Sequence, residues 1–359
     1  MPSVNIVLMG FGNVGKAFSR LMADKREICR ARYGLNLRLK AIFRSEGGYL
    51  AGRGSEFNGR VEPSASNAVD HPAWKTGLRL DEVLSGLEPG VLVECTPTDL
   101  KTGEPGLSHI RQALDRNWHI AAASKGALVL KFRELMARAN MNGVQIKFSG
   151  ATAAALPTVD VGVISLVGTD ILGIEGILTG VTNLILTRME EGITFQAALR
   201  EAQDKGIAEP DPSLDVDGWD TACKILLISN AVAGTDFTLS DIVREGIRGV
   251  TVDDIQKARN EGKILKLLGR LVRDEGKDKA DVRLTAIDKT HPLFHVTGTN
   301  KAITYFTDTM GAITLSGGKS DPRGTAAALL KDIINIYRHS EEDADGSHSG
   351  KIDLIPDFW

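Results

Sequence analysis

Three glycines near the N-terminus have the spacing of a turn that can hold a pyrophosphate. An apolar segment leads into Gly10, Gly12 and Gly15, in the pattern G-x-G-x-x-G. The first glycine of such a pattern permits the sharp turn, the second lets the backbone approach the phosphates, and the third lets a helix pack close to the strand. The first N–H groups of that helix then face the anion. The pattern predicts a strand, a turn and a helix that bind a dinucleotide, with Asn13 and Val14 in the same predicted site.

The densest cluster of ionisable side chains lies in residues 209–224. Beside two prolines and a glycine, this segment holds five carboxylates and a lysine: Glu209, Asp211, Asp215, Asp217, Asp220 and Lys224. Asp220 and Lys224 are four residues apart on a helix that we expect to begin near Gly218, so they share one face of that helix.

Two interpretations of this cluster are open. In the structural one, Asp217 caps the helix, Asp220 is a first-turn acid favoured by the helix dipole, and Asp220 and Lys224 form a surface ion pair. In the functional one, the pair is buried, because residues 222–228 are apolar apart from Lys224 itself. Buried ionisable groups are candidates for a functional site.

Further candidates follow the ends of two predicted strands. They are Thr96, Pro97, Thr98, Ser124 and Lys125. Ligands of an open parallel sheet bind at the carboxyl ends of its strands, so the Thr-Pro-Thr loop is predicted to lie beside the nicotinamide of the dinucleotide. For Lys125, a catalytic or binding role and a solvated turn are both open.

The end of the second strand bears on which dinucleotide is bound. An NAD-preferring fold usually has an acidic residue there for the ribose hydroxyls, whereas this strand ends in Arg44, with Arg53 further along the loop. An arginine suits the additional phosphate of NADP. We therefore predict NADP, with NAD as the alternative, in which Glu46 would bind the ribose. Arg44 as a plain solvated strand end is a third interpretation.

These residues require a sheet that presents its strand ends on one edge. Over residues 1–150, strand-like and helix-like segments alternate, which is typical of a parallel sheet with crossover helices. Strands are predicted at 5–9, 37–43, 90–95, 119–122 and 144–148, and helices at 14–30, 107–116 and 130–140. Residues 44–72, rich in Gly, Ser and Asn, are expected to form a long surface excursion.

Residues 151–318 are predicted to form a second, α+β domain. A small-residue loop at 151–157 opens it, with strands at 171–178, 264–273, 281–287 and 302–307 and helices at 194–205, 219–232 and 252–261. A helix within 320–340 is apolar enough to complete the first domain, and a tail occupies 341–359. The expected fold class is α/β, with an N-terminal Rossmann dinucleotide-binding domain (1–150) and an α+β catalytic and dimerisation domain.

Composition narrows the classes of function. A net charge of −3 over 359 residues disfavours a nucleic-acid-binding surface. Three widely separated cysteines disfavour a disulfide framework or a zinc site and fit a reducing compartment. No apolar stretch reaches membrane-spanning length, and the N-terminus lacks the pattern of a signal peptide. We expect a cytoplasmic protein that acts on a small molecule, with no nucleic-acid or membrane partner.

Together these motifs make the chain resemble the homoserine dehydrogenase family. The similarity runs from about residue 5 to residue 336 and rests on residues 10–15, 96–98, 124–126, 178–186, 188–195, 201–224 and 291–293. It implies an NAD(P)-dependent interconversion of L-aspartate 4-semialdehyde and L-homoserine by hydride transfer, on the route to threonine and methionine. It also implies a homodimer built through the sheet of the second domain.

The resemblance assigns roles to individual residues. Lys224 would be the catalytic lysine, Asp220 its substrate-positioning partner and Lys125 a second active-site lysine. An ammonium suits this role because hydride arriving at the aldehyde carbon leaves charge on the oxygen, which the ammonium can stabilise and protonate. Contacts to the substrate would come from Glu209, Asp215, Gly180 and Thr182.

The chain departs from the family pattern at several positions. Ser149 stands where the family usually has a glutamate that helps to hold a sodium ion, Ala153–Ala155 replaces a glycine-rich stretch, and Val181 replaces a threonine that lines the substrate site. These departures speak against a bound monovalent cation. They also leave two alternatives, a paralogous dehydrogenase of another hydroxy amino acid and a non-catalytic Rossmann redox sensor. Because the sequence ends where longer members continue, control by threonine through a regulatory domain is not expected.

Overall fold

The computed structural model describes the chain apart from residues 53, 58–70, 275–276, 319–320 and 339–359. The chain divides into two compact units. Unit 1 comprises Met1–Ala151 and the C-terminal segment from Asp321, and unit 2 comprises Thr152–Ser320. Two features named from the sequence, Arg53 and the tail 341–359, lie outside the described residues.

Unit 1 is built on a seven-stranded sheet of order β4-β3-β2-β1-β5-β6-β7. The strands are β1 (Ser3–Met9), β2 (Asn36–Arg44), β3 (Gly47–Leu50), β4 (Trp74–Thr76), β5 (Val91–Glu94), β6 (His119–Ala122) and β7 (Ile146–Lys147). The five strands β2, β1, β5, β6 and β7 are parallel. Because β1 is followed by β2 on one side and pairs with β5 on the other, the topological switch point lies between β1 and β5. This is the Rossmann-type α/β fold class that the sequence predicts.

The helices of unit 1 form two groups. One group consists of α1 (Asn13–Asp24), α2 (Arg26–Tyr33) and α12 (Pro322–Arg338), and the other of α3 (Leu80–Ser85), α4 (Gly106–Leu114) and α5 (Gly126–Met141). The C-terminal helix α12 places Leu329 and Ile333, both fully buried, in the same core cluster as Phe18 of α1 and Ile6 of β1. Residues from the two ends of the chain therefore share one hydrophobic core.

Two local predictions for unit 1 are wrong. The single helix predicted at 14–30 is two helices, because Lys25 between them has a non-helical backbone with φ −100° and ψ 3°. The predicted surface excursion instead begins with a tight hairpin, in which Arg44 pairs with Gly47 and β3 runs back along β2. A Cβ atom at Gly48 would lie 2.6 Å from the carbonyl oxygen of Ile42, so this strand requires glycine where the sequence suggested a loop.

Unit 2 contains a six-stranded sheet of order β13-β12-β8-β10-β11-β9. Its strands are β8 (Ile171–Ile177), β9 (Val243–Arg244), β10 (Lys263–Asp274), β11 (Lys277–Asp288), β12 (Lys301–Thr307) and β13 (Ala312–Gly317). Its helices are α6 (Thr158–Asp160), α7 (Gly180–Glu190), α8 (Phe195–Asp204), α9 (Ser213–Val216), α10 (Trp219–Val232) and α11 (Val252–Asn260). The predicted helix 219–232 coincides with α10, whereas α7, β9 and β13 were not predicted.

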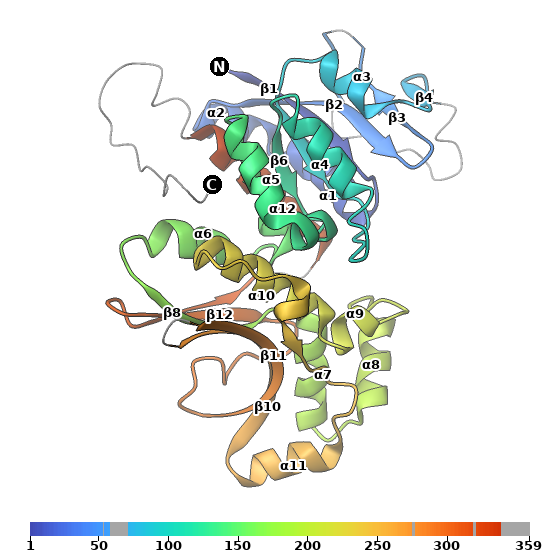
Figure 1. Ribbon diagram of the computed structural model, residues 1–359. Coiled ribbons are helices and arrows are strands. Elements are labelled where there is room, and N and C mark those ends of the chain that lie inside the picture. The colour runs from blue at the N-terminus through green and yellow to red at the C-terminus, as the bar shows by residue number, and fades with distance from the viewer. Residues whose placement is uncertain (53, 58–70, 275–276, 319–320, 339–359) are drawn as a thin grey trace. The chain divides into compact units, whose positions relative to one another are not determined.

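Helix α10 packs on this sheet at a glycine. A Cβ atom at Gly269 of β10 would lie 3.0 Å from the Thr221 methyl and 3.2 Å from Ile225 Cβ, so the missing side chain lets α10 approach closely. Figure 1 shows α10 along one face of the sheet of unit 2. Thr221 and Ile225 flank Lys224 along the chain. This contact therefore fixes the part of α10 that carries the lysine.

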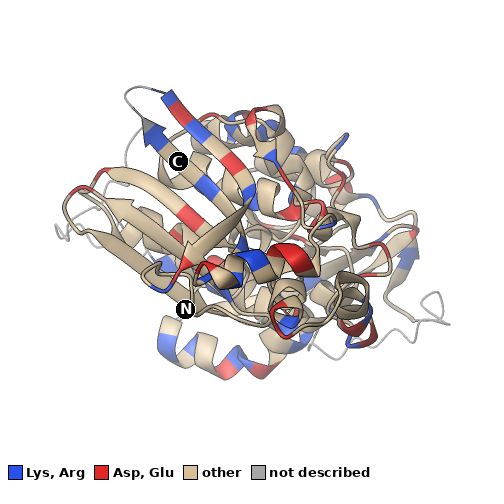
Figure 2. Cartoon of the chain, turned by 90° about the horizontal axis from the view of Figure 1, so that it is seen from below, with Lys and Arg blue, Asp and Glu red and all other residues tan. Residues whose placement is uncertain are grey.

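The surface of the β10–β11 hairpin carries paired charges of both signs. Arg270 lies 2.8 Å from Asp281, and Arg273 lies 3.3 Å from Asp278. Figure 2 shows Lys and Arg interspersed with Asp and Glu along these strands. Within the described part of the chain, no helix is long and apolar enough to cross a membrane.

Candidate active site

The three N-terminal glycines occupy positions that a side chain would disturb in different ways. Gly10 has φ +88°, and a Cβ atom there would lie 2.7 Å from the Cys95 carbonyl oxygen. A Cβ atom at Gly15 would lie 2.2 Å from the Gly10 carbonyl oxygen. At Gly12, in contrast, a Cβ atom would meet no protein atom within 4 Å. The first and third glycines are thus required by the fold, whereas the second borders open space, as a backbone that approaches a pyrophosphate must.

The helix that follows is suited to an anion. Gly12 is the N-cap of α1 and makes no side-chain cap hydrogen bond. Asn13 and Val14 form the first helical positions, where backbone N–H groups have no partner within the helix. Since the turn also lies at the switch point between β1 and β5, the residues present fit a dinucleotide.

A buried carboxylate organises the Thr-Pro-Thr loop. Glu94, at the end of β5, is fully buried. Its Oε1 accepts hydrogen bonds from the backbone N–H and the hydroxyl of Thr96, with 2.8 Å for the former, and its Oε2 lies 2.9 Å from Nδ1 of His109. Neither Glu94 nor His109 is among the site residues that the sequence predicts. A glutamate that ends an apolar strand was the available signal, but its partner His109 lies on a different element.

The structure brings Lys125 and the Thr-Pro-Thr loop together. The backbone N–H of Lys125 donates to Thr98 Oγ1 at 3.2 Å, and the N–H of the buried Ser124 donates to the Glu94 carbonyl at 3.3 Å. Residues 96–98 and 124–125 therefore lie at the carboxyl ends of the adjacent strands β5 and β6. This is the edge at which the sequence predicts the nicotinamide.

Arg44 ends β2 next to the glycine-rich turn. The backbone N–H of Gly10 donates to the carbonyl of Phe43, the residue before Arg44. Arg44 and Glu46 are both exposed in the hairpin turn. Among the described residues, the Arg44 guanidinium has no ion-pair partner, so its charge is available to a ligand.

In unit 2, Lys224 and Asp220 form a close pair. The lysine Nζ lies 2.6 Å from Asp220 Oδ2 and donates to the carbonyl of Leu178 at 2.9 Å. The same Oδ2 accepts a hydrogen bond from Thr179 Oγ1 at 2.9 Å. Only 14% of the lysine side chain and 15% of the aspartate side chain are exposed. The pair is thus mostly buried, as the functional interpretation requires, and the predicted shared face is confirmed.

Two other carboxylates of the cluster have structural partners. Asp217 does not cap α10, whose N-cap is Gly218 with φ +80°. Instead, Asp217 binds the Arg248 guanidinium through both oxygens, at 2.8 and 3.0 Å, and these hydrogen bonds lower the pKa of its carboxyl. Asp211 accepts hydrogen bonds from the N–H and hydroxyl of Ser213, which also lower its pKa.

The remaining candidates lie on elements that contact one another. Glu209 is exposed before α9, and Asp215 is half-buried on α9, which packs against both α7 and α10. Gly180 and Thr182 lie in the first turn of α7, directly after Thr179, and the Thr182 hydroxyl donates to the Thr179 carbonyl at 3.2 Å. The start of α7 and the start of α10 therefore meet through the hydrogen bond from Thr179 to Asp220.

Comparison with known proteins agrees with this geometry. A sequence model described as homoserine dehydrogenase matches residues 157–334, and one described as the NAD-binding domain of homoserine dehydrogenase matches residues 10–149. A homoserine dehydrogenase of Methanocaldococcus jannaschii is 32% identical over 342 residues, which cover 94% of this chain and 100% of the relative. The chain belongs to the homoserine dehydrogenase family.

Further relatives support the assignment. An NAD(+)-dependent homoserine dehydrogenase of Pseudomonas canavaninivorans is 31% identical and covers 94% of this chain and 97% of its own length. The crystal structure of a homoserine dehydrogenase from Thiobacillus denitrificans has a TM-score of 0.83 at 26% identity, covering 96% of this chain and 75% of that one. The chain is thus an oxidoreductase of the homoserine dehydrogenase type with a nicotinamide dinucleotide-binding domain.

Ser149, which replaces the usual glutamate of homoserine dehydrogenases, has its own buried partners. Its N–H and hydroxyl donate to the two carboxylate oxygens of Asp332, at 2.9 and 2.8 Å, and the Lys331 ammonium donates to its hydroxyl oxygen at 2.7 Å. Over the described ranges, no group of three or more His, Cys, Asp or Glu residues is arranged to hold a metal ion.

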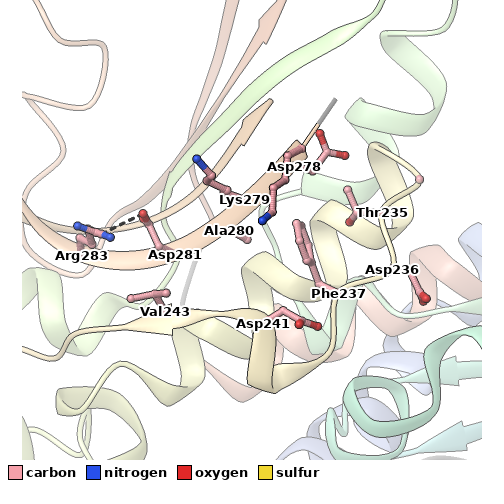
Figure 3. Close-up of a pocket in the computed structure, with 12 residues that line it drawn as sticks. Thr235, Asp236, Phe237, Asp241, Val243, Asp278, Lys279, Ala280, Asp281 and Arg283 are labelled. Atoms are coloured by element: carbon pink, nitrogen blue, oxygen red, sulfur yellow. Dashed lines mark ion pairs between the residues drawn. The ribbon is translucent and has the colours of Figure 1, made fainter. Parts of the chain in front are cut away.

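A separate open pocket of about 630 Å³ lies on unit 2, between β11 and the segment after α10 (Figure 3). Asp278, Lys279 and Asp281 border it from β11, and Asp281 pairs with Arg283 at 3.0 Å. None of the candidate site residues lines this pocket. It therefore adds no residue to the candidate active site.

Proposed function

We propose that this protein is an NADP-linked homoserine dehydrogenase that interconverts L-homoserine and L-aspartate 4-semialdehyde, a step of threonine and methionine biosynthesis. The observation that carries the proposal is the mostly buried pair of Lys224 and Asp220, 2.6 Å apart at the meeting point of α7 and α10. A lysine held in this way can move a proton at its Nζ, which the carbonyl–alcohol conversion requires.

Unit 1 would hold the cofactor. The glycine turn with Asn13 and Val14 would bind the pyrophosphate, and Thr96, Pro97, Thr98, Ser124 and Lys125 would surround the nicotinamide end. When bound, the dinucleotide supplies or accepts the hydride. The hydroxyl of Thr96 donates to Glu94, so only its oxygen lone pair is left for a ligand.

Lys224 would handle the proton. In the direction of reduction, its ammonium stabilises charge on the substrate oxygen and then protonates it. In the direction of oxidation, the neutral amine accepts the hydroxyl proton, so the rate should rise with pH. Asp220, fixed by Thr179, holds the lysine Nζ in place and is its positioning partner.

The amino-acid end of the substrate would be bound by the remaining candidates of unit 2. Glu209 and Asp215 offer carboxylates to the α-ammonium, on a segment stiffened by two prolines. Gly180 and Thr182 belong to the first turn of α7, where unpaired backbone N–H groups suit a carboxylate.

The enzymatic proposal is tested by following the absorbance of the reduced nicotinamide with L-homoserine and each cofactor. The wild type should turn over homoserine, and Lys224→Ala should lose at least about 100-fold in kcat while it still binds the cofactor. A Lys224→Ala variant with wild-type kcat would remove the lysine from the mechanism. Turnover of a different hydroxy amino acid with negligible turnover of homoserine would assign the chain to a paralogous activity.

The preference for NADP rests on the exposed Arg44 beside the glycine turn. Arg44→Ala should weaken NADP binding by about 10-fold or more and leave NAD binding nearly unchanged, because only NADP carries the additional phosphate. Dissociation constants from fluorescence titration of both cofactors measure this difference. Equal losses for the two cofactors would contradict the assignment and favour NAD, the cofactor named for the Pseudomonas relative.

We also propose that the protein forms a homodimer through the sheet of unit 2. The side chain position of Gly269 faces α10, so its neighbour Arg270 points to the opposite face of the sheet, where it pairs with Asp281. Val272, two residues further on, is 45% exposed. Sedimentation velocity should give twice the 38.6 kDa mass of one chain, whereas a monomer at micromolar concentration would contradict the proposal.

A further inference from the structure

Lys301 is a buried lysine that the proposed mechanism does not use. It is the first residue of β12 and only 3% exposed, and its Nζ donates to the carbonyl oxygen of Ala153 at 2.6 Å. Tyr305, four residues along the strand and on the same face, donates its hydroxyl to the carbonyl of Thr158 at 2.6 Å. Strand β12 thus holds the segment 153–158 through two buried donors.

This segment follows the point at which the chain enters unit 2. The strand that precedes the return to unit 1 lies beside it. In the β12–β13 ladder, Lys301 pairs with Gly317. The next residue, Gly318, has φ +76°, and a Cβ atom there would lie 2.7 Å from the Leu156 nitrogen. Lys301 therefore lies beside the first residues of unit 2 and at the end of β13.

The segment combines an unusual backbone conformation with a charged donor. Ala154 has φ +54°, which is unusual for a residue other than glycine. The Ala153 carbonyl accepts a hydrogen bond from the Leu156 N–H at 3.2 Å, and the Lys301 ammonium binds the second lone pair of the same oxygen. Backbone carbonyl oxygens of this kind can bind K⁺. The Lys301 ammonium carries the same single positive charge at the end of a covalently attached side chain.

The residues present do not fit the sodium ion that the family resemblance implies. Position 149 has no carboxylate, and the Ser149 hydroxyl is bonded to Asp332 and Lys331. The Ala153 carbonyl is already bound by Lys301. We propose that the Lys301 ammonium is a built-in replacement for a monovalent cation, which holds the segment 153–158 and makes the protein independent of K⁺ and Na⁺.

The first test measures cation binding through stability and does not rest on the proposed function. Thermal unfolding of the wild type and of Lys301→Met is compared in KCl, NaCl and choline chloride at equal ionic strength. The wild-type midpoint should be the same in all three salts. The Lys301→Met midpoint should be lower in choline and rise by about 5 °C or more in KCl or NaCl, because an ion that binds only the folded state stabilises it.

Lys266→Met is the matched control. Lys266 on β10 is also fully buried, but its Nζ lies 3.3 Å from Asn183 Oδ1 and 3.6 Å from Glu190 Oε1 and not on the segment 153–158. This variant should be destabilised equally in the three salts. If Lys301→Met folds in KCl but not in choline chloride, that difference is itself the expected gain in stability. The unfolding midpoint of Lys301→Gln is then measured in the three salts in its place.

The second test follows turnover of homoserine and therefore rests on the proposed function. The wild-type rate should not depend on the cation, and Lys301→Met should lose about 10-fold in kcat and recover most of it in ammonium or potassium chloride. A wild type stabilised or activated by K⁺ or Na⁺ over choline would overturn the proposal. So would variants of Lys301 that show no cation-specific gain. If the wild type does not turn over homoserine, the proposed function fails, whereas the unfolding midpoints still judge the role of Lys301.

Discussion

At the level of single residues, the carboxylates of the segment 209–224 differ in the side chains that they contact and not in their residue type. Asp217 and Asp220 are three residues apart, yet Asp217 points to the Arg248 guanidinium and Asp220 to Lys224 and Thr179. The first pair joins the loop that carries Arg248 to the start of α10. The second holds a lysine Nζ in a mostly buried position. The two acids therefore make a matched set for mutation.

We expect Asp220→Asn to lower kcat by about 100-fold, because the lysine Nζ loses its charged partner and its position, while the Asp217→Asn variant keeps kcat within about two-fold of the wild type. The Asp217→Asn variant should lose about 1 kcal/mol of stability or less, as expected of a partly exposed ion pair. Steady-state kinetics and denaturant unfolding of both variants provide the measurement. Equal losses of kcat would mean that Asp220 has no special role.

At the scale of the element, the turn between β1 and α1 shows how three identical residues serve different purposes. Gly10 and Gly15 are required because backbone atoms of the protein lie where their side chains would be. Gly12 borders open space, so the folded chain alone gives no reason for a glycine there. A ligand that approaches the N-terminus of α1 would supply that reason.

Substitution of these glycines should therefore separate folding from binding. Gly12→Ala should change the free energy of unfolding by no more than about 1 kcal/mol, which is the range for an N-cap position, and weaken cofactor binding by about 10-fold or more. Gly10→Ala should reduce stability by several kcal/mol through strain and overlap with Cys95. Calorimetric titration and thermal unfolding check both statements. Wild-type cofactor affinity in Gly12→Ala would contradict the assigned pyrophosphate site.

At the scale of the whole molecule, the C-terminal helix returns to the first unit and completes its core. The contact of His119 with Tyr337 illustrates this closure, with ring centroids 5.5 Å apart. His119 begins β6, and its Nδ1 accepts a hydrogen bond from the N–H of Gln145 at 3.0 Å. Burial lowers the pKa of His119 to about 4. The folded protein therefore holds this ring in its neutral form.

This burial predicts a pH dependence of stability. The unfolded chain takes up a proton at His119 below a pH of about 6.5, whereas the folded chain does so only near its lowered pKa of about 4. The unfolding free energy of unit 1 should therefore fall by about 2.5 kcal/mol as the pH drops from 6.5 to 4. Urea unfolding of the wild type and of His119→Gln measures this term, which the variant should lack. The exposed His295, replaced by Gln, is the control and should leave the profile unchanged.

Local patterns in the chain were sufficient for the dinucleotide turn, for helix 219–232, for most strands and for the α/β class. Glycine spacing and the alternation of apolar residues act between near neighbours, so they can be read in order along the chain. The same patterns failed at β3. Its glycines are required by the neighbouring strands β2 and β4, and β4 follows β3 by more than 20 residues in the sequence.

Only the tertiary structure decided which polar groups meet. Asp220 and Lys224 are near neighbours and could be paired from their spacing, but the carbonyl of Leu178 is 46 residues from Lys224. Glu94 meets His109 across two elements, and Lys301 meets Ala153 across 148 residues. Such contacts depend on how strands are ordered in a sheet and how helices pack on it. The periodicity of apolar residues does not predict the order of the strands or the packing of the helices, because both arise from the burial of many residues at once.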